Sequence, residues 1–155
     1  MDAVDRAIIT ELERDGRLTN VELAHRVGLT TGPCLRRVQR LEADGVIRGY
    51  RAVIDAAAVG RSVEVLLDIP LEAQDADTVE HFERTLTEAE EVVELRRLFG
   101  SPDYFMRVAV ADLAAYETFL SRRVMTIPRM KGVTSRFTMK KVKPRTDLYD
   151  RSGNA

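Results

Sequence analysis

LTNVELAHRVGLTTGPCLRRVQRLEADGVIRGYR, residues 18–51, is the stretch that decides the fold, and it predicts two helices joined by a tight turn. Thr19 and Glu22 have the spacing of a capping box, in which each side chain accepts the other residue's backbone N–H. Gly28 breaks the first helix, and Thr30 or Thr31 is expected to cap the second.

The second helix of this stretch has two chemically different faces. Pro33 falls in its first turn, where the missing N–H costs no hydrogen bond, and Gly45 is expected to end it. At about 100° per residue, Cys34, Val38 and Leu41 lie on one side, with Leu35 at the edge. The opposite face carries Gly32, Pro33, Arg36, Gln39 and Arg40, with Arg37 flanking.

A helix with an apolar face and an arginine-rich face, held by a shorter helix across a glycine turn, is typical of DNA-binding proteins. Arg36 and Arg40 are the candidates for contacts with base edges, since arginine can bond guanine bidentately. The candidates for phosphate contacts are Thr30, Thr31, Arg37, Arg48 and Arg51. The alternative is a small helical core whose arginines only face water.

The flanking segments complete a small N-terminal domain. Val4, Ile8 and Leu12 recur every four residues and predict a helix over 2–14, which would cover the two central helices. Residues 46–54 alternate loosely and are rich in β-branched side chains, which favours a wing strand. We therefore expect a winged helix-turn-helix domain over 1–54 and a linker over 55–62.

After the linker, the pattern changes to alternating strands and helices. Strands are predicted at 63–69, 92–99, 104–110 and 133–142, and helices at 76–87 and 113–127. The order β-α-β-β-α-β is that of the ferredoxin-like fold, so the chain is expected to be α+β. This domain should span 63–143, followed by a tail over 144–155. Both helices would cover one face of the sheet, and the half-apolar opposite face implies a second copy of the chain.

The sequence Gly-Ser-Pro-Asp-Tyr at 100–104 separates two of the predicted strands. A tight turn explains the glycine, serine, proline and aspartate without any function. The same residues could also hold a ligand, because a carboxylate accepts hydrogen bonds from an ammonium group and loop N–H groups can bind a carboxylate.

The run VGLTTGPCLRRVQRLEADGVIRGYRAVID (27–55) and the loop at 100–104 together resemble the Lrp/AsnC family of transcriptional regulators, over about 2–143. The resemblance implies a C-terminal RAM domain that senses a ligand, and homodimers that often assemble into octameric discs. It also implies an amino-acid effector pocket at the dimer interface. The candidate effector contacts are Gly100, Ser101, Pro102, Asp103 and Tyr104, with Thr134 and Ser135 as the opposite wall. Arg96 and Arg97 depart from the uncharged residues found in many relatives.

Charge and composition restrict the partners. The formal net charge is −1, and residues 1–54 contain nine arginines against eight acidic residues. DNA affinity must therefore come from a local patch, doubled by dimerisation. No apolar run approaches a membrane span, and the N-terminus lacks the features of a signal peptide. We expect a cytoplasmic protein that does not bind membranes.

Enzyme chemistry is not indicated by the sequence. Cys34 is the single cysteine, and His25 and His81 belong to different predicted domains, so we expect no disulfide, metal site or cofactor. No phosphate-binding loop or nucleophile elbow is present, so no catalytic residue is assigned. A small acyl-phosphate hydrolase would need a water-orienting amide, but Asn20 and Asn154 lie outside the core of the ferredoxin-like half.

These observations predict a transcriptional regulator that binds double-stranded DNA and responds to a small effector, most simply an amino acid. Two recognition helices, one per subunit, would enter successive major grooves. The alternative function is an architectural DNA-binding protein without a small-molecule effector.

Overall fold

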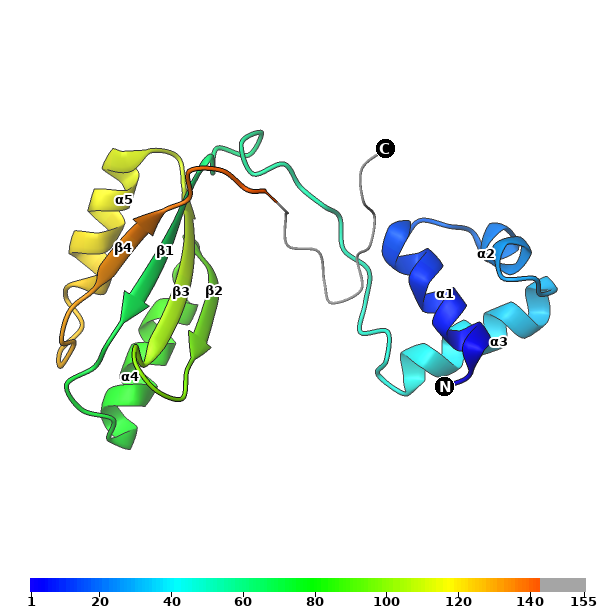
Figure 1. Ribbon diagram of the computed structural model, residues 1–155, viewed down its shortest axis with the longest axis horizontal. Helices are drawn as coiled ribbons and strands as arrows, with labels where there is room; N and C mark the ends of the chain where they lie inside the picture. The colour runs from blue at the N-terminus through cyan, green and yellow to red at the C-terminus, as the bar shows by residue number, and fades with distance from the viewer. Residues whose placement is uncertain (143–155) are drawn as a thin grey trace. The chain divides into compact units, whose positions relative to one another are not determined.

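The computed structural model describes residues 1–142 of the 155-residue chain. The described chain divides into two compact units, Met1–Val53 and Ile54–Val142, which are shown in Figure 1. The tail predicted for 144–155 lies outside the described residues. Over 1–142, none of the helices is long and apolar enough to span a membrane.

The N-terminal unit contains the three predicted helices, α1 (Ala3–Arg14), α2 (Asn20–Arg26) and α3 (Thr31–Ala43). Both α1 and α2 begin with a capping box, formed by Asp2 with Asp5 and by Thr19 with Glu22. Gly28 and Gly45 each have φ +68°, a left-handed conformation that glycine adopts without strain and that ends a helix. The helix boundaries predicted from these signals are confirmed.

The core of this unit lies between the three helices. It consists of the buried side chains of Ile8, Leu23, Ala24, Cys34 and Leu41, with Val38 partly buried against them. The predicted apolar face of α3 is therefore confirmed. Burial raises the pKa of the Cys34 thiol, which keeps it protonated and unreactive.

The wing strand predicted for 46–54 is not formed. The N–H groups of Val46 and Ile47 both donate to the carbonyl of Leu41, at 2.9 and 3.0 Å, and turn the chain back against the end of α3. The following residues have no regular secondary structure. A strand needs a neighbouring strand for its backbone hydrogen bonds, and no described segment of this unit supplies one.

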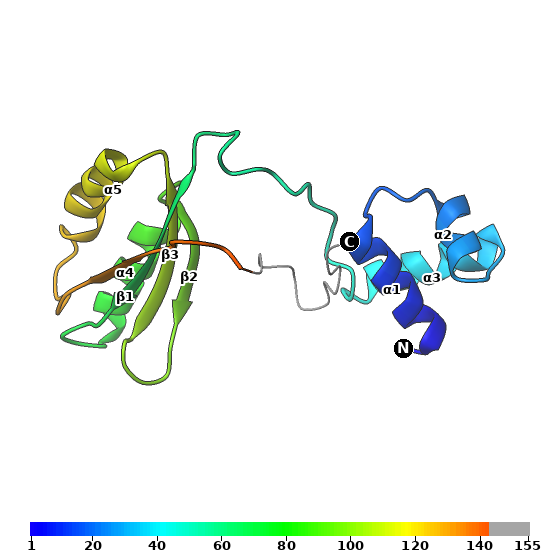
Figure 2. The same cartoon turned by 45° about the horizontal axis from the view of Figure 1, so that its top comes forward.

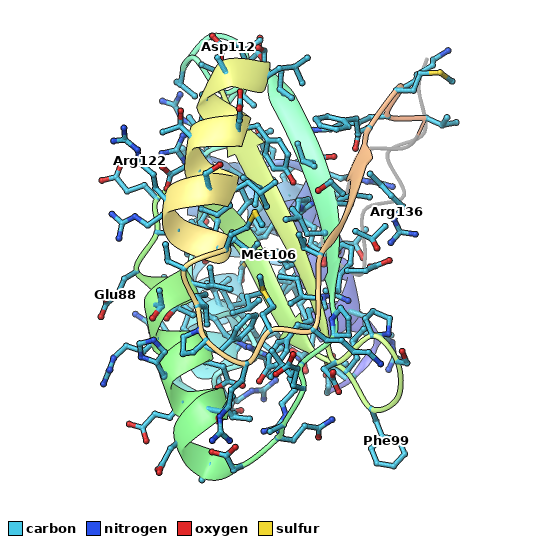
Figure 3. All side chains as sticks on the ribbon, turned by 90° about the vertical axis from the view of Figure 1, so that its left-hand side faces the viewer. Glu88, Phe99, Met106, Asp112, Arg122 and Arg136 are labelled. Carbon is cyan, nitrogen blue, oxygen red and sulfur yellow. The ribbon has the colours of Figure 1, made fainter. Side chains whose placement is uncertain are left out.

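The C-terminal unit is a four-stranded antiparallel sheet with spatial order β2-β3-β1-β4. The strands are β1 (Val63–Ile69), β2 (Val92–Arg97), β3 (Tyr104–Val110) and β4 (Thr134–Phe137). The helices α4 (Ala76–Thr87) and α5 (Leu113–Phe119) cover one face of the sheet (Figures 2 and 3). The predicted ferredoxin-like order and α+β class are confirmed.

Side chains along the central strands alternate between buried and partly buried, as expected when only one face of a sheet is covered. Val65, Leu67 and Ile69 of β1 and Tyr104, Met106, Val108 and Val110 of β3 are buried towards the helices, as Figure 3 shows for Met106. The alternate residues of both strands are only partly buried. Because side chains in a strand point to opposite faces in turn, one complete face of this sheet is left without helices.

The helix predicted for 113–127 is interrupted. Regular α-helix ends at Phe119 and continues as one wider turn, η1 (Leu120–Val124), in which the N–H of Met125 donates to the carbonyl of Leu120 at 2.8 Å. The wider turn inserts a residue, so Phe119 and Val124, five positions apart, both face the core. A regular helix would have rotated one of them away.

Two predicted strands are shorter than expected. The strand predicted for 133–142 is regular only over Thr134–Phe137. The Thr138 N–H still donates to the carbonyl of Glu64 at 3.1 Å, but β1 begins at Val63, opposite Met139 in this register, and offers no partner to the residues after it. The strand predicted for 92–99 ends at Arg97, and the loop follows from there.

We expect Leu67→Ala to lower the free energy of unfolding by about 2–5 kcal/mol, because it leaves a cavity in the centre of the C-terminal core. Urea titration followed by circular dichroism measures the change. Leu113→Ala is the matched control, since Leu113 lies on α5 and is 63% exposed. Equal losses for the two variants would contradict the assignment of the core.

Candidate DNA interface and effector site

The residues predicted to contact DNA lie on the outer side of α3 and in the segment after it. Thr30 is the N-cap of α3, and its side chain makes no capping hydrogen bond. Pro33 and Arg37 are half-buried, and the remaining candidates are exposed: Thr30, Thr31, Gly32, Arg36, Gln39, Arg40, Arg48 and Arg51. Within the N-terminal unit, the outer face of α3 is therefore largely exposed.

The three arginines of α3 differ in their contacts. Arg37 Nη1 donates to Asp2 Oδ2 and to Asp5 Oδ1, both at 2.7 Å. Arg40 Nη2 donates to the two carboxylate oxygens of Asp5 at 2.8 and 2.7 Å. Within residues 1–142, Arg36 has no carboxylate at ion-pair distance, and it alone of the three presents an unpaired guanidinium.

Electrostatics keep the two aspartates ionised. The backbone N–H of Asp5 and then the Arg37 guanidinium lower the pKa of Asp2 to about 2. The pKa of Asp5 is also lowered, first by the backbone N–H of Asp2 and also by the two arginines. A lowered carboxyl pKa contributes stability that is present above the unfolded-state pKa and is lost as the pH falls through the folded-state value. The contacts between α1 and α3 should therefore persist throughout the neutral range.

Asp5 belongs to this surface although the sequence patterns did not indicate it, and the same holds for two further contacts. Asn20 Nδ2 donates to the carbonyl of Thr31 at 2.9 Å and joins the start of α2 to the start of α3. The Tyr50 hydroxyl donates to Glu42 at 2.9 Å; burial, followed by this hydrogen bond, raises the pKa of Tyr50 to about 12. One feature of the sequence could have identified Asp5: it lies on the same helix face as the apolar residues Ile8 and Leu12, where a carboxylate needs a partner.

The loop at 100–104 is fixed by its own chain. Asp103 Oδ2 accepts the backbone N–H of Leu71 at 2.7 Å, and Asp103 Oδ1 accepts a hydrogen bond from the Gln74 amide. The loop contains a cis peptide bond between Ser101 and Pro102. Phe99 is fully exposed and projects away from the domain (Figure 3). The Asp103 carboxylate thus joins the turn between β2 and β3 to the segment between β1 and α4.

The other predicted effector residues lie near the same end of the sheet but face different ways. The Tyr104 side chain is buried and its hydroxyl donates to Glu83 at 2.7 Å; burial, and then this bond, raises its pKa. The Ser135 hydroxyl lies 2.5 Å from that of Tyr116, on the helix side of β4. Thr134 alternates to the opposite face, so Thr134 and Ser135 do not form one wall.

A hollow of about 490 Å³ adjoins the anchored loop within the C-terminal unit. Arg97 of β2 contributes the cation and Glu80 and Glu83 of α4 contribute the carboxylates. The complete lining is Gln74, Ala76, Val79, Glu80, Glu83 and Arg97. A site with both charges and a short apolar floor can bind a small zwitterion.

The helix-free face of the sheet carries ion pairs around an apolar centre. Arg107 pairs with Glu94 at 2.8 Å, Arg136 with Asp68 at 2.7 Å and Lys141 with Glu64 at 2.9 Å. Figure 3 shows Arg136 on the side away from the helices. Leu66 and Phe105 lie among these pairs and are partly buried. Among the described residues, no group of His, Cys, Asp or Glu is arranged to hold a metal ion.

Both halves of the chain match models of known protein families. Residues 1–48 match a winged helix-turn-helix DNA-binding domain, and residues 64–148 match the Lrp/AsnC ligand-binding domain. The N-terminal unit is therefore a DNA-binding helix-turn-helix domain and the C-terminal unit a ligand-binding domain.

Relatives resemble the chain over nearly its whole length. The Bkd operon transcriptional regulator of Pseudomonas aeruginosa is 39% identical over 92% of this chain and 93% of its own length. The leucine-responsive regulatory protein of Escherichia coli is 36% identical over 92% of this chain and 87% of its own.

Solved structures give the same result. The crystal structure of an AsnC family regulator from Agrobacterium tumefaciens has TM-score 0.90 and 39% identity, covering 96% of both chains. A Neisseria meningitidis transcriptional regulator, solved as a complex with L-Met, has TM-score 0.91 and 30% identity, also covering 96% of both. With matches to both domain families and to relatives along its length, the chain belongs to the Lrp/AsnC family of transcriptional regulators.

Proposed function

We propose that this regulator recognises a specific DNA sequence through α3 and responds to an amino acid bound by its C-terminal domain. The observation that supports the DNA part is the exposed guanidinium of Arg36, which has no ion pair within residues 1–142 and lies opposite the buried side chains of Cys34 and Leu41. An arginine so placed can reach the N7 and O6 atoms of a guanine when the helix enters the major groove. Arg48, beyond the end of α3, would contact phosphates and set the register.

Two copies of the chain would pair through the helix-free face of the sheet. Its ion pairs neutralise the charges on that face, so two identical faces can meet without like-charge repulsion. Leu66 and Phe105 would supply the apolar centre of the contact. Such a dimer places two α3 helices on one duplex.

The hollow beside the 100–104 loop is our candidate for the effector site. Arg97 can bind an α-carboxylate, and Glu80 or Glu83 can accept hydrogen bonds from an α-ammonium group. The L-Met bound by the Neisseria meningitidis regulator supports an amino acid as the ligand class. Binding would alter how subunits associate and so bias DNA affinity, with a coupling free energy of about 1–3 kcal/mol.

One observation favours the alternative of an architectural protein without an effector. The Asp103 carboxylate, expected to contact a ligand, is already occupied by Leu71 and Gln74 of its own chain. The loop would then serve only to fix the end of the sheet. A test of effector binding must therefore change Arg97, which lines the hollow, and leave Asp103 intact.

Arg36→Ala should weaken binding to the preferred DNA site by ~1–3 kcal/mol and relax the sequence preference at one position. Fluorescence anisotropy with specific and shuffled duplexes measures both effects. Arg122→Ala on η1 removes the same charge from the other domain and serves as the control (Figure 3). An equal loss on both duplexes would reassign Arg36 to a phosphate contact.

Phe105→Glu places a charge in the apolar centre of the helix-free face and should shift the protein to monomers. The same change should weaken DNA binding, because two linked recognition helices bind more tightly than one. Light scattering after size exclusion gives the mass of the particle. Leu113→Glu, at an exposed position of α5, is the matched control. An unchanged mass for Phe105→Glu would rule out pairing through this face.

Arg97→Gln should abolish most of the thermal stabilisation produced by the responsive amino acid, because the variant loses the cation that binds the α-carboxylate. In the wild type, a ligand at about 100 times its Kd stabilises the folded state by about 2.7 kcal/mol. A thermal-shift screen across all amino acids identifies that ligand. Arg96→Gln is the control, because Arg96 precedes Arg97 on β2 and is paired with Glu94. No shift with any amino acid would favour the architectural alternative.

A further inference from the structure

Asp5 is the one buried charged side chain in the part of the chain that the structure describes, with 1% of its surface exposed. It lies on α1, outside the helix proposed to contact DNA, and the sequence patterns indicated no role for it. Its carboxylate accepts the guanidinium N–H groups of Arg37 and Arg40 at 2.7–2.8 Å and the backbone N–H of Asp2 at 3.0 Å. Every one of these donors carries a positive charge or belongs to a helix N-terminus.

This arrangement fixes α3 against α1 in two respects. A buried carboxylate is tolerated only with charged or hydrogen-bonded partners, so Arg37 and Arg40 cannot leave it without a large loss of stability. The two arginines are three residues apart on α3 and converge on one carboxylate. Their joint contact therefore restrains both the position of α3 along α1 and its rotation about its own axis.

The same contacts decide which arginine faces the DNA. Asp5 and Asp2 neutralise the two guanidinium groups of Arg37 and Arg40, whereas Arg36 has no ion pair within residues 1–142. Arg36 lies next to Arg37 in the chain, so any rotation of α3 that released Arg37 would also move Arg36. The direction of the unpaired arginine thus depends on a carboxylate that never touches DNA.

We propose that Asp5 is a positioning residue of the DNA interface: it holds Arg37 and Arg40 against α1 and thereby directs Arg36 alone to the base edges. This inference rests on the proposed recognition of DNA by α3. It changes the role predicted for Arg40 from a base contact to an anchor. Asp2, which accepts a second hydrogen bond from Arg37 at 2.7 Å, assists in the same way.

Asp5→Asn tests the proposal, since it keeps the shape of the side chain and removes its charge. The preferred duplex is first selected by the wild-type chain from a randomised pool, and binding to it is compared with binding to a shuffled duplex. We expect the ratio of the two affinities to fall ~10-fold, the scale of one lost bidentate base contact. Affinity for the shuffled duplex should not fall, and the slope of log K against log salt should steepen by roughly 1–2, because the released arginines can reach phosphates.

Asp44→Asn is the matched control. Asp44 lines the same surface hollow as Asp5 and Arg40, but it is exposed and takes part in no ion pair among residues 1–142. It should leave both the ratio and the slope unchanged. If Asp5→Asn weakens both duplexes by one factor at constant slope, Asp5 is merely structural and the proposal is wrong.

A second pair of variants keeps the test decisive if Asp5→Asn does not fold. Arg36→Gln should lower the affinity ratio ~10-fold, whereas Arg40→Gln, at an arginine whose side chain is 53% exposed, should change it less than about twofold. Equal losses would show that Arg40 contacts bases and would overturn the inference while leaving DNA recognition by α3 intact. If the wild-type chain selects no duplex, sequence-specific recognition itself fails, and the inference fails with it.

Discussion

A buried carboxylate is costly unless charged or hydrogen-bonding partners surround it, and the contact between α1 and α3 depends on meeting this requirement at Asp5. The apolar core of the N-terminal unit contains few fully buried side chains, so α1 is held to α3 by charge as well as by packing. Asp5 lies between Ile8 and the N-cap residue Asp2, where the capping box already supplies one N–H. Two arginines of α3 complete the coordination of the carboxylate. In the proposed interface, α3 would therefore be oriented by a buried residue of α1 that makes no contact with DNA.

In the C-terminal unit, side-chain hydrogen bonds hold the turn between β2 and β3. Its sheet is covered by α4 and α5 on one face only, and the turn between β2 and β3 must still be kept in place beside a hollow lined by both signs of charge. Asp103 does this by accepting the Leu71 N–H and the Gln74 amide, and Tyr104 does it through Glu83. Asp103, a residue type that often contacts ligands, thus anchors the turn to the segment between β1 and α4. Arg97 lines the hollow and is exposed, with no ion pair among residues 1–142.

The elements predicted correctly are those whose signals are local. The capping box of Thr19 and Glu22, the glycine at 45 and the short apolar runs of β1 and β3 each depend on a few neighbouring residues, so these helices and strands could be placed to within a residue or two. The wing at 46–54, the length of β4 and the wider turn η1 depend on partners distant in the sequence. A strand pattern without a neighbouring strand forms no ladder, and a helical pattern cannot show that one turn must widen to keep Phe119 and Val124 in the core.

By itself, the sequence determined the order of elements, the two-domain organisation, the buried face of α3 and the family, because these follow from periodicity, capping residues and contiguous motifs. Only the tertiary structure decided what each charged residue does. The spacing of Arg36, Arg37 and Arg40 placed Arg36 and Arg40 together on the outer face of α3, with Arg37 beside them, but it could not show which of the three is held in an ion pair. Arg37 and Arg40 meet a carboxylate more than thirty residues earlier in the chain, whereas Arg36 meets none within residues 1–142. Ion pairs form between groups that the fold brings together, so the availability of a charge to DNA is a property of the packed molecule.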